Sequence, residues 1–168
     1  MRYCTLQWKK LHKDAVIPTK RKEDAGLDIY TIEDDVEIQP LETYFFKTGL
    51  ASSFPSTFWA EVKERGSTGA INLSVRSGVI DSGYRGEWKI MLTNLNPYPV
   101  EVTSAVGRVT YEYYKWPRKN KIKKVYYPKS KAIAQAVING LPIVNCEEVT
   151  DALDSSIRGS SGWGASGK

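Results

Sequence analysis

Residues 78–87, GVIDSGYRGE, hold the side chains best suited to chemistry on a water molecule beside a flat ligand. Asp81 opens a turn, and Ser82 and Gly83 suit the unusual dihedral angles of a tight hairpin. Tyr84 begins the expected return strand, and its ring can lie flat against a sugar or a base. A carboxylate at a hairpin rim can act as a general base on water. Taken alone, the stretch is more typical of a hairpin with an ordinary turn aspartate, so the interpretation depends on what accompanies it.

Residues 64–69, ERGSTG, directly follow a predicted strand and have the composition of a phosphate-binding turn. Glycine allows main-chain N–H groups to turn inward and form a concave anion site, and Arg65 can grip a phosphate through two parallel hydrogen bonds. The hydroxyl of Ser67 adds a further donor. This combination of basic, hydroxyl-bearing and flexible residues predicts contact with phosphate.

Three further segments place polar residues where a ligand could be held. Gly26 and Asp28 lie in a strand and turn context, DAGLDIY, and Gln135 is the polar residue of the apolar strand IAQAVI. The glycine-rich sequence RGSSGWGASGK adds Arg158 and Trp163. That sequence also has the spacing of a phosphate-binding P-loop, but no strand–helix unit surrounds it, so we expect a flexible arm instead.

Alternation of polar and apolar residues dominates the chain and predicts the strands that must position these groups. The alternating apolar residues are Phe58, Ala60 and Val62 in TFWAEVKE, Trp88, Ile90 and Leu92 in EWKIMLTN, and Val100 and Val102 in PVEVTSAV. VEIQP, TYFFKTGL and AIAQAVI are shorter candidates. Sustained helical periodicity is absent, and the best helix candidates are a turn or two in STGAINLSV or EEVTDALD. Many short strands between frequent turns predict an all-β sandwich or barrel.

The length of 168 residues predicts one domain, placed at residues 1–153, followed by a flexible arm at residues 154–168. No apolar run approaches the roughly 20 residues of a membrane helix, so no membrane contact is expected. Cys4 and Cys146 belong to no metal-binding pair and are expected to be free thiols in a reducing compartment, the cytoplasm. With His12 as the single histidine, a histidine-ligated metal centre is nearly excluded.

Together and in this order, the five segments resemble the motifs of the trimeric dUTPase family. AGLDIY resembles the first motif, ERGSTG the second, GVIDSGYRGE the third, AIAQAVI the fourth and RGSSGWGASGK the fifth. The resemblance implies a distorted jelly-roll β-barrel assembled as a homotrimer, with active sites at subunit interfaces and a C-terminal arm that closes over a site. It implies hydrolysis of dUTP to dUMP and pyrophosphate, with Mg²⁺ held by the triphosphate and by water rather than directly by the protein.

The resemblance also implies a role for each motif residue. Asp81 would activate the attacking water at the α-phosphate, with Asp28 and Gln135 supporting the catalytic centre. Asp28 would support either the water shell of the metal or the catalytic water. Tyr84 would pack on the sugar and exclude a 2′-hydroxyl group, and Trp163 would stack on the uracil. The implied substrate-binding residues are Arg65, Gly66, Ser67, Gly78, Val79, Ile80, Tyr84, Lys89, Arg158, Trp163 and Gly164.

Two motifs depart from the family pattern. The second usually reads Arg-Ser-Ser or Arg-Ser-Gly, whereas Gly66 takes the second place here, so either Ser67 or the main-chain N–H of Gly66 has the usual serine's role. The fourth usually carries an arginine where this chain has Ala132. Either one phosphate contact is missing here, or Lys129 or Lys131 replaces the arginine as a point charge.

The separation between the third and fourth motifs is long for the family, and the excess coincides with a basic and aromatic segment at residues 109–131. Residues 115–131 hold eight Lys or Arg and no acid, whereas the net charge of the whole chain is only +5. The segment is interpreted as an extra hairpin or a solvated β-arm. One alternative is that it binds a protein, since dUTPases of some phages carry extra segments here. The other is that it binds single-stranded nucleic acid through its lysines, Trp116, Tyr126 and Tyr127.

Two alternative functions compete with dUTP hydrolysis. A dCTP deaminase-like enzyme needs a glutamate in the strand after the third motif, where this chain has Met91. A catalytically idle regulatory binding protein on the same barrel would not need both Asp81 and Tyr84. The resemblance therefore favours the hydrolase, placed in the host cytoplasm if a phage encodes it.

Overall fold

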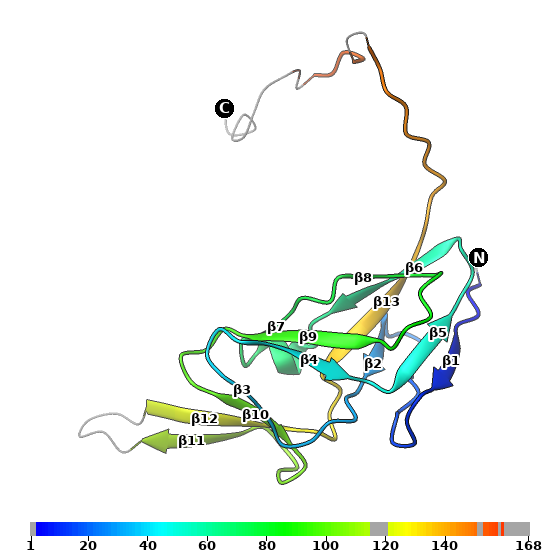
Figure 1. Cartoon of the computed structure of the whole chain (residues 1–168). Helices are drawn as coiled ribbons and strands as arrows, with labels where there is room; N and C mark the ends of the chain where they lie inside the picture. Colours follow the sequence, from blue (N-terminus) through cyan, green and yellow to red (C-terminus); the bar gives the residue numbers. More distant parts are fainter. Residues whose placement is uncertain (1–2, 115–120, 151–152, 158, 160–168) are drawn as a thin grey trace.

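The computed structural model describes residues 3–114, 121–150, 153–157 and 159, and consists almost entirely of β-strands (Figure 1). The all-β prediction is therefore confirmed. In chain order the elements are β1 (Gln7–Lys10), β2 (Gly26–Ile29), β3 (Val36–Ile38), β4 (Thr43–Lys47), β5 (Leu50–Ser53), β6 (Phe58–Lys63), α1 (Gly66–Gly69), β7 (Leu73–Val75), β8 (Val79–Asp81), β9 (Lys89–Asn94), β10 (Val100–Thr103), β11 (Thr110–Tyr114), β12 (Lys121–Pro128) and β13 (Ala134–Gly140).

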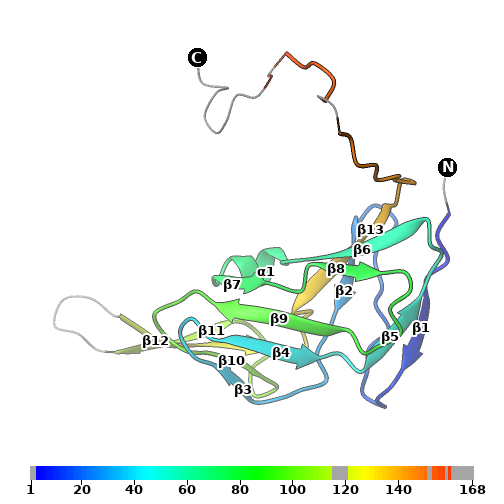
Figure 2. The same cartoon turned by 45° about the horizontal axis from the view of Figure 1, so that its top comes forward.

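The strands of the described residues form four small sheets. Their orders are β1-β5, β11-β12-β10-β3, β2-β13-β6-β8 and β4-β9-β7. β10 and β12 pair in parallel, and the other strand pairs are antiparallel. Figures 1 and 2 show the hairpin of β11 and β12 projecting from the body, while β13 lies between β2 and β6. This last arrangement brings together segments that are far apart in the sequence.

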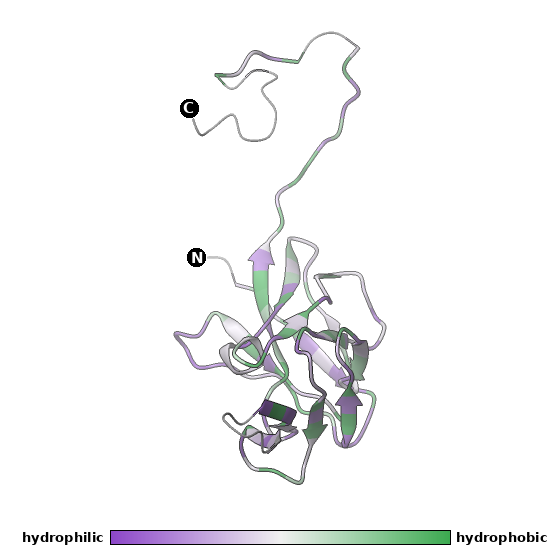
Figure 3. Cartoon of the chain, turned by 90° about the vertical axis from the view of Figure 1, so that its left-hand side faces the viewer, coloured by the Kyte–Doolittle hydropathy of each residue, from purple (hydrophilic) through white to green (hydrophobic). Residues whose placement is uncertain are grey.

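The alternation read from the sequence places the apolar side chains in a common core. Ala60 and Val62 of β6 are buried, as are Ile90 and Leu92 of β9 and Val100 of β10. Figure 3 shows apolar and polar segments alternating along the strands of the body. Because full burial of one such Val, Leu or Ile side chain stabilises a fold by about 1.5–3 kcal/mol, this repeated pattern accounts for the arrangement. The largest fully buried side chains are Trp88, Tyr127, Phe46, Ile29, Ile38, Leu50, Leu73, Ile90, Leu92 and Ile133.

Helical structure within the described residues is confined to the four residues of α1. It overlaps the first helix candidate, STGAINLSV, whereas residues 147–150 of the second candidate are not helical. No helix in the described ranges is long and apolar enough to span a membrane.

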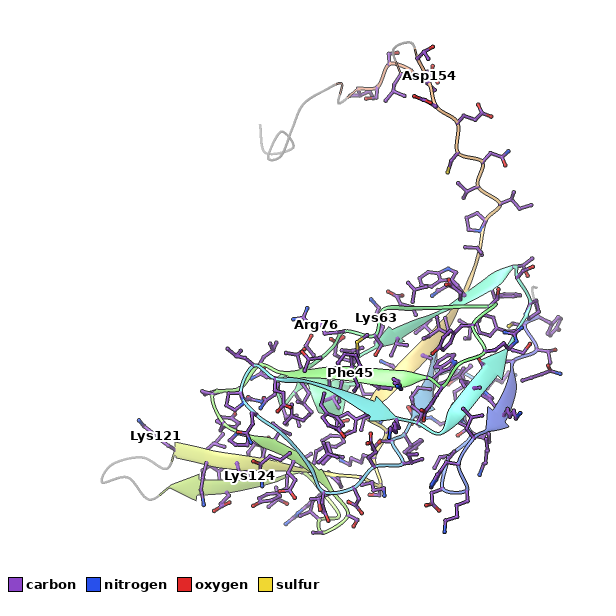
Figure 4. All side chains as sticks on the ribbon, viewed as in Figure 1. Phe45, Lys63, Arg76, Lys121, Lys124 and Asp154 are labelled. Atoms are coloured by element: carbon purple, nitrogen blue, oxygen red, sulfur yellow. The ribbon has the colours of Figure 1, made fainter. Side chains whose placement is uncertain are left out.

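Beyond β13 the chain runs away from the body as an extended segment (Figures 1 and 4). Residues 141–150 and 153–157 are all exposed, including the apolar side chains of Ile143 and Leu153, at 96% and 83%. Figure 4 places Asp154 far from the strands. The domain boundary expected after residue 153 stays a prediction.

Candidate active site

The stretch around Asp81, which the sequence indicated as functional, borders a cavity of about 300 Å³. Asp81 and Tyr84 both line it and are both exposed, so the structure brings together the predicted base and the predicted sugar-facing ring. Gly78 stands just before β8 with a φ of 65°, a left-handed conformation that favours glycine. The complete lining is Phe45, Ser77, Val79, Ile80, Asp81, Tyr84, Glu87, Lys89 and Met91.

The chain around Asp81 does not form the predicted hairpin. β8 pairs with β6, with Asp81 opposite Trp59, whereas β9 pairs with β4 and β7. Tyr84 therefore lies in a connection between two sheets and does not begin a return strand, so this prediction was wrong. The turn itself exists, since the Tyr84 N–H donates to the Asp81 carbonyl at 3.1 Å. Turn residues mark a change of direction but do not determine the sheet that the next strand joins.

The ring of Tyr84 is fixed by two neighbours in this connection. Its hydroxyl donates to the carbonyl of Glu87 at 3.0 Å. A Cβ atom added to Gly86 would lie 2.5 Å from that hydroxyl, so a glycine is required at position 86 for the ring to occupy this place. The orientation of Tyr84 thus depends on a short local network.

Sequence reasoning missed Ser77, Phe45, Glu87 and the exposure of Met91 in this cavity. The Oγ of Ser77 accepts a hydrogen bond from the Met91 N–H at 2.8 Å and donates to the Lys89 carbonyl at 3.4 Å. Ser77 therefore engages main-chain groups of β9, the strand that begins at Lys89, one of the implied substrate-binding residues. The alternation in β9 contained the signal for Met91, because its neighbours face the core, but nothing distinguished Ser77.

Asp28, Arg65 and Gln135 come together in a second, strongly polar cavity of about 580 Å³. The Nε of Arg65 lies 3.0 Å from a carboxylate oxygen of Asp28, and both side chains are about 30% exposed. β13 explains the meeting, because it places Gln135 opposite Asp28 on one side and opposite Lys63 on the other. Three residues chosen from three distant motifs are thus neighbours.

Gln135 is held in one position by groups on both sides. Its Nε2 donates to the carbonyl of Glu64 at 2.8 Å, and a Cβ atom on Gly26 would lie 2.3 Å from its Oε1. Glu64 is itself anchored, since its carboxylate accepts from the Val75 N–H at 2.8 Å and from the Ser74 hydroxyl at 3.2 Å. Burial raises the pKa of Glu64, but these hydrogen bonds and that of its own N–H outweigh burial and leave the pKa below its usual value.

The residues just before the first motif also line the charged cavity, and sequence reasoning missed them. Lys20 donates to the carbonyl of Asp24 at 2.6 Å, and the Nε of Arg21 lies 3.0 Å from the Asp24 carboxylate. The basic run KRK ahead of DAGLDIY was the signal that could have found them. They add positive charge beside Arg65.

The turn that carries Gly66 and Ser67 forms α1, and Ser67 lines neither of these two cavities. Its Oγ lies 2.9 Å from the hydroxyl of Tyr127, which is fully buried. Gly66 is exposed, with open space where a side chain would stand. Of the three residues predicted to bind phosphate here, Arg65 is the one found in the charged cavity.

Comparison with known proteins decides the family. A family model described as dUTPase matches residues 13–107. The deoxyuridine 5′-triphosphate nucleotidohydrolase of Clostridioides difficile is 34% identical, over 96% of this chain and 97% of that protein. The one from Nautilia profundicola is 35% identical, over 97% and 99%. This chain belongs to the dUTPase family.

Solved structures of phage dUTPases share the fold. The dUTPase of Staphylococcus bacteriophage 80alpha with dUpNHpp has a TM-score of 0.73 and 27% identity, covering 98% of this chain and 99% of that one. The dUTPase from phage phi11 of S. aureus, described with a species-specific insert, has a TM-score of 0.67 and 25% identity, covering 88% and 97%. The predicted family and β-rich jelly-roll fold are confirmed, and this dUTPase is a dUTP-hydrolysing enzyme.

Neither lysine expected to replace the family's arginine at Ala132 lines the charged cavity of this dUTPase. The Nζ of Lys129 lies 3.6 Å from the Asp34 carboxylate and lines a different cavity with it, so the substitution by Lys129 is not supported. Lys131 does not line the charged cavity either. Lys20 and Arg21 are the additional cations there.

The segment predicted to be an insertion, residues 109–131, contains the β11–β12 hairpin of this dUTPase, and residues 115–120 lie outside the described part. Lys124 makes ion pairs with Glu37 and Glu101, and Lys123 lies 2.7 Å from Glu112. Burial lowers the pKa of Lys124, but the two carboxylates outweigh burial and raise it above its usual value. Figure 4 shows Lys121 and Lys124 along β12. Glu37 and Glu101 of the body and Glu112 of the hairpin thus neutralise part of the basic segment.

The interpretation of Tyr127 as a base-stacking residue was wrong, because its side chain has no exposed surface. It belongs to the buried core, and its main chain pairs with Val102 of β10. Contact of residues 115–131 with a protein or with single-stranded nucleic acid stays a prediction. Arg158, Trp163 and Gly164 of the fifth motif lie outside the described residues.

The two cavities of one dUTPase chain lie toward opposite ends of β6. Asp81 is opposite Trp59, near the start of the strand, and Gln135 is opposite Lys63, at its end. Four residues of strand correspond to about 13 Å. The two cavities share no lining residue.

The charged cavity has a donor set that fits a metal arriving with the nucleotide. Among the residues that the structure describes, no cluster of three or more His, Cys, Asp or Glu side chains is placed to hold a metal ion. Mg²⁺ prefers oxygen ligands and keeps several of its waters, so the carboxylate of Asp28 suits contact through water.

Proposed function

We propose that this enzyme converts dUTP to dUMP and pyrophosphate by attack of a water molecule, activated by Asp81, at the α-phosphate. The observation that carries this proposal is the position of Asp81 beside Tyr84 at the rim of the 300 Å³ cavity. The carboxylate accepts a proton from the attacking water and orients it in line with the leaving pyrophosphate. Tyr84 lies along the deoxyribose and leaves no room for a 2′-hydroxyl group.

The charged cavity supplies the neutralisation that this attack needs. A triphosphate carries several negative charges, and catalysis of phosphoryl transfer depends on positioning and on electrostatic stabilisation. Arg65 binds phosphate oxygens, and Lys20 and Arg21 add to the positive potential. Gln135 is a neutral donor and acceptor in a fixed position, suited to orient a phosphate or the water shell.

Mg²⁺ bound to the triphosphate supplies further neutralisation of the charge that develops on the leaving group. Asp28 would accept hydrogen bonds from the waters around that ion, and its ion pair with Arg65 keeps the guanidinium group oriented. The protein residues therefore place the nucleotide and its hydrated metal together, with no direct protein ligand.

The separation of the two cavities supports active sites shared between copies of the chain. Asp81 must approach the α-phosphate through one water, whereas Arg65 must hold the same phosphate chain. In one chain the two groups are set toward opposite ends of β6. A homotrimer joins the cavity of Asp81 on one chain to the charged cavity of a second. The arm with Arg158, Trp163 and Gly164 then closes over the bound nucleotide, with Trp163 on the uracil.

One assay tests the reaction. The protein is incubated with dUTP, dCTP, dTTP or UTP and Mg²⁺, and pyrophosphate and ammonia are both measured. Pyrophosphate from dUTP alone is the expected result. Ammonia from dCTP would instead indicate the deaminase, which Met91 in the cavity argues against because a thioether cannot shuttle protons. Absence of both products would leave the idle binding protein as the function.

A further inference from the structure

Tyr127 makes two hydrogen bonds that join two parts of the proposed active site. It lies on β12 with no exposed surface. Its hydroxyl donates to the carbonyl of Ala132 at 2.8 Å and lies 2.9 Å from the Oγ of Ser67. Ser67 is two residues after Arg65, and Ala132 is three residues before Gln135. One buried phenol thus contacts both segments that carry the phosphate-facing side chains.

The direction of these two hydrogen bonds follows from counting protons. A carbonyl oxygen only accepts, so the single proton of the phenol goes to Ala132. The other contact can then form only if the Ser67 hydroxyl donates to the oxygen of Tyr127. The proton of Ser67 is therefore engaged inside the protein, and Ser67 cannot donate it to a phosphate without breaking this bond.

The phenol is well suited to hold this arrangement. Burial raises the pKa of Tyr127 above its usual value, although the Ser67 hydrogen bond acts in the opposite direction, so the phenol keeps its proton near neutral pH. Parallel pairing of β12 with β10, with Tyr127 opposite Val102, fixes the main chain from which the ring extends. The ring therefore provides a rigid support beneath α1.

We propose that Tyr127 is a positioning residue of this enzyme, which anchors the turn at Ser67 and thereby places Arg65 for the triphosphate. Ser67 serves as the attachment point of the turn and is not the hydroxyl donor to phosphate. This inference rests on the proposed function. It also resolves the ambiguity of the second motif, because Ser67 does not take the usual serine's role.

Steady-state hydrolysis of dUTP by Tyr127→Phe, Ser67→Ala and the double variant tests the proposal. Because loss of one neutral hydrogen bond loosens the turn and weakens ground-state and transition-state binding alike, each single variant is expected to raise KM about three- to tenfold, with little change in kcat. The double variant should match the single variants, since both remove the same bond. Ser67→Thr, which keeps the hydroxyl, should restore KM.

Tyr126→Phe is the matched control. Tyr126 is the adjacent residue on β12, and its hydroxyl bonds to the Glu112 carboxylate on the hairpin, away from Ser67. Its KM should equal that of the wild type. Tyr127→Phe also leaves the Ala132 carbonyl without its donor and can reduce stability, whereas Ser67→Ala leaves that bond intact, so thermal unfolding of each variant separates stability from KM.

Two results would overturn the inference. An increase in KM for Ser67→Ala with wild-type KM for Tyr127→Phe, or effects that multiply in the double variant, would show that Ser67 contacts the phosphate directly. Wild-type KM in all three variants would show that the bond positions nothing. Both differ from failure of the proposed function, in which the wild-type protein itself releases no pyrophosphate from dUTP.

Discussion

The two cavities of this chain differ in how firmly their functional groups are held. In the charged cavity Arg65 is paired with Asp28, and Gln135 is bonded to Glu64 and confined by Gly26. In the other cavity Asp81 is exposed, and it is the last residue of the three-residue strand β8. One region is ordered by its own side chains, whereas the other offers a carboxylate that its own chain does not surround.

This difference follows from the chemistry proposed for each region. Groups that stabilise charge act best when their dipoles and charges are fixed before the substrate arrives. A general base needs access to water, and in the proposed homotrimer its surroundings would be completed by the substrate and by a neighbouring chain. On that proposal half of the site is preorganised within one chain, and the other half becomes complete on assembly.

The largest effect is expected from Asp81→Asn, which removes the proposed base and keeps the shape of the residue. General-base catalysis contributes about 10²–10⁴-fold, so kcat should fall by that factor while the Kd for a non-hydrolysable dUTP analogue stays near the wild-type value. Steady-state kinetics and calorimetric titration measure the two quantities. A kcat above a tenth of the wild-type value would show that Asp81 is not the general base.

Mixing two inactive variants tests whether the two cavities belong to different chains. Arg65→Ala alone should lose about 10²–10³-fold in kcat. When the two variants are co-expressed, the mixed trimers should show about a quarter of wild-type activity. Random assembly places an intact Asp81 of one chain beside an intact Arg65 of the next in about one interface in four. Activity that stays at the level of the separate variants would mean that each chain holds its own complete site.

A smaller loss is expected from Gly26→Ala, which disturbs the preorganised cavity alone. The added Cβ would lie 2.3 Å from the Oε1 of Gln135, so the amide must move. Misplacement of such a group by about 1 Å costs up to roughly 10²-fold in kcat/KM. The control is Gly107→Ala, whose Cβ meets open space. Equal kcat/KM for the two variants would show that the position of Gln135 is unimportant.

The smallest effect concerns Glu64 and the pH dependence of stability. Its pKa lies below the ordinary 4.5, so its carboxylate contributes stability that is fully present above that pH and is lost as the pH falls through the folded-state pKa. Glu64→Gln should therefore reduce the free energy of unfolding by about 1 kcal/mol near neutral pH, and by less in acid. Urea unfolding across pH measures this. The exposed Glu23→Gln is the control, and an identical pH profile for both would contradict the assignment.

The sequence predicted the residues of the charged cavity better than it predicted how the strands around the Asp81 cavity pair. Asp28, Arg65 and Gln135 were chosen from separate motifs, and β13 brings them together because its residues pair with both β2 and β6. The strands were predictable because alternation reports burial on one face, as in β9. The pairing of β8 with β6 was not, since local turn chemistry carries no information about a partner about twenty residues away.

Two kinds of site residue escaped sequence reasoning for physical reasons. Ser77 acts through contacts with main-chain groups of β9, and such contacts depend on three-dimensional placement rather than on residue type. Tyr127 was misread because tyrosine suits both a binding surface and a core with one buried hydroxyl partner. Its two hydrogen bonds, to Ser67 and Ala132, span residues far apart in the chain.

The extended segment after β13 has a consequence for how stability must be expressed. Ile143, Leu153 and other apolar side chains there are exposed on the single chain, although water disfavours such surface. In the proposed homotrimer a neighbouring copy that covers them would contribute binding free energy, which depends on protein concentration through mass action. The melting temperature of such an assembly would be a property of the solution as well as of the sequence, and it would carry meaning only together with the concentration at which it was measured.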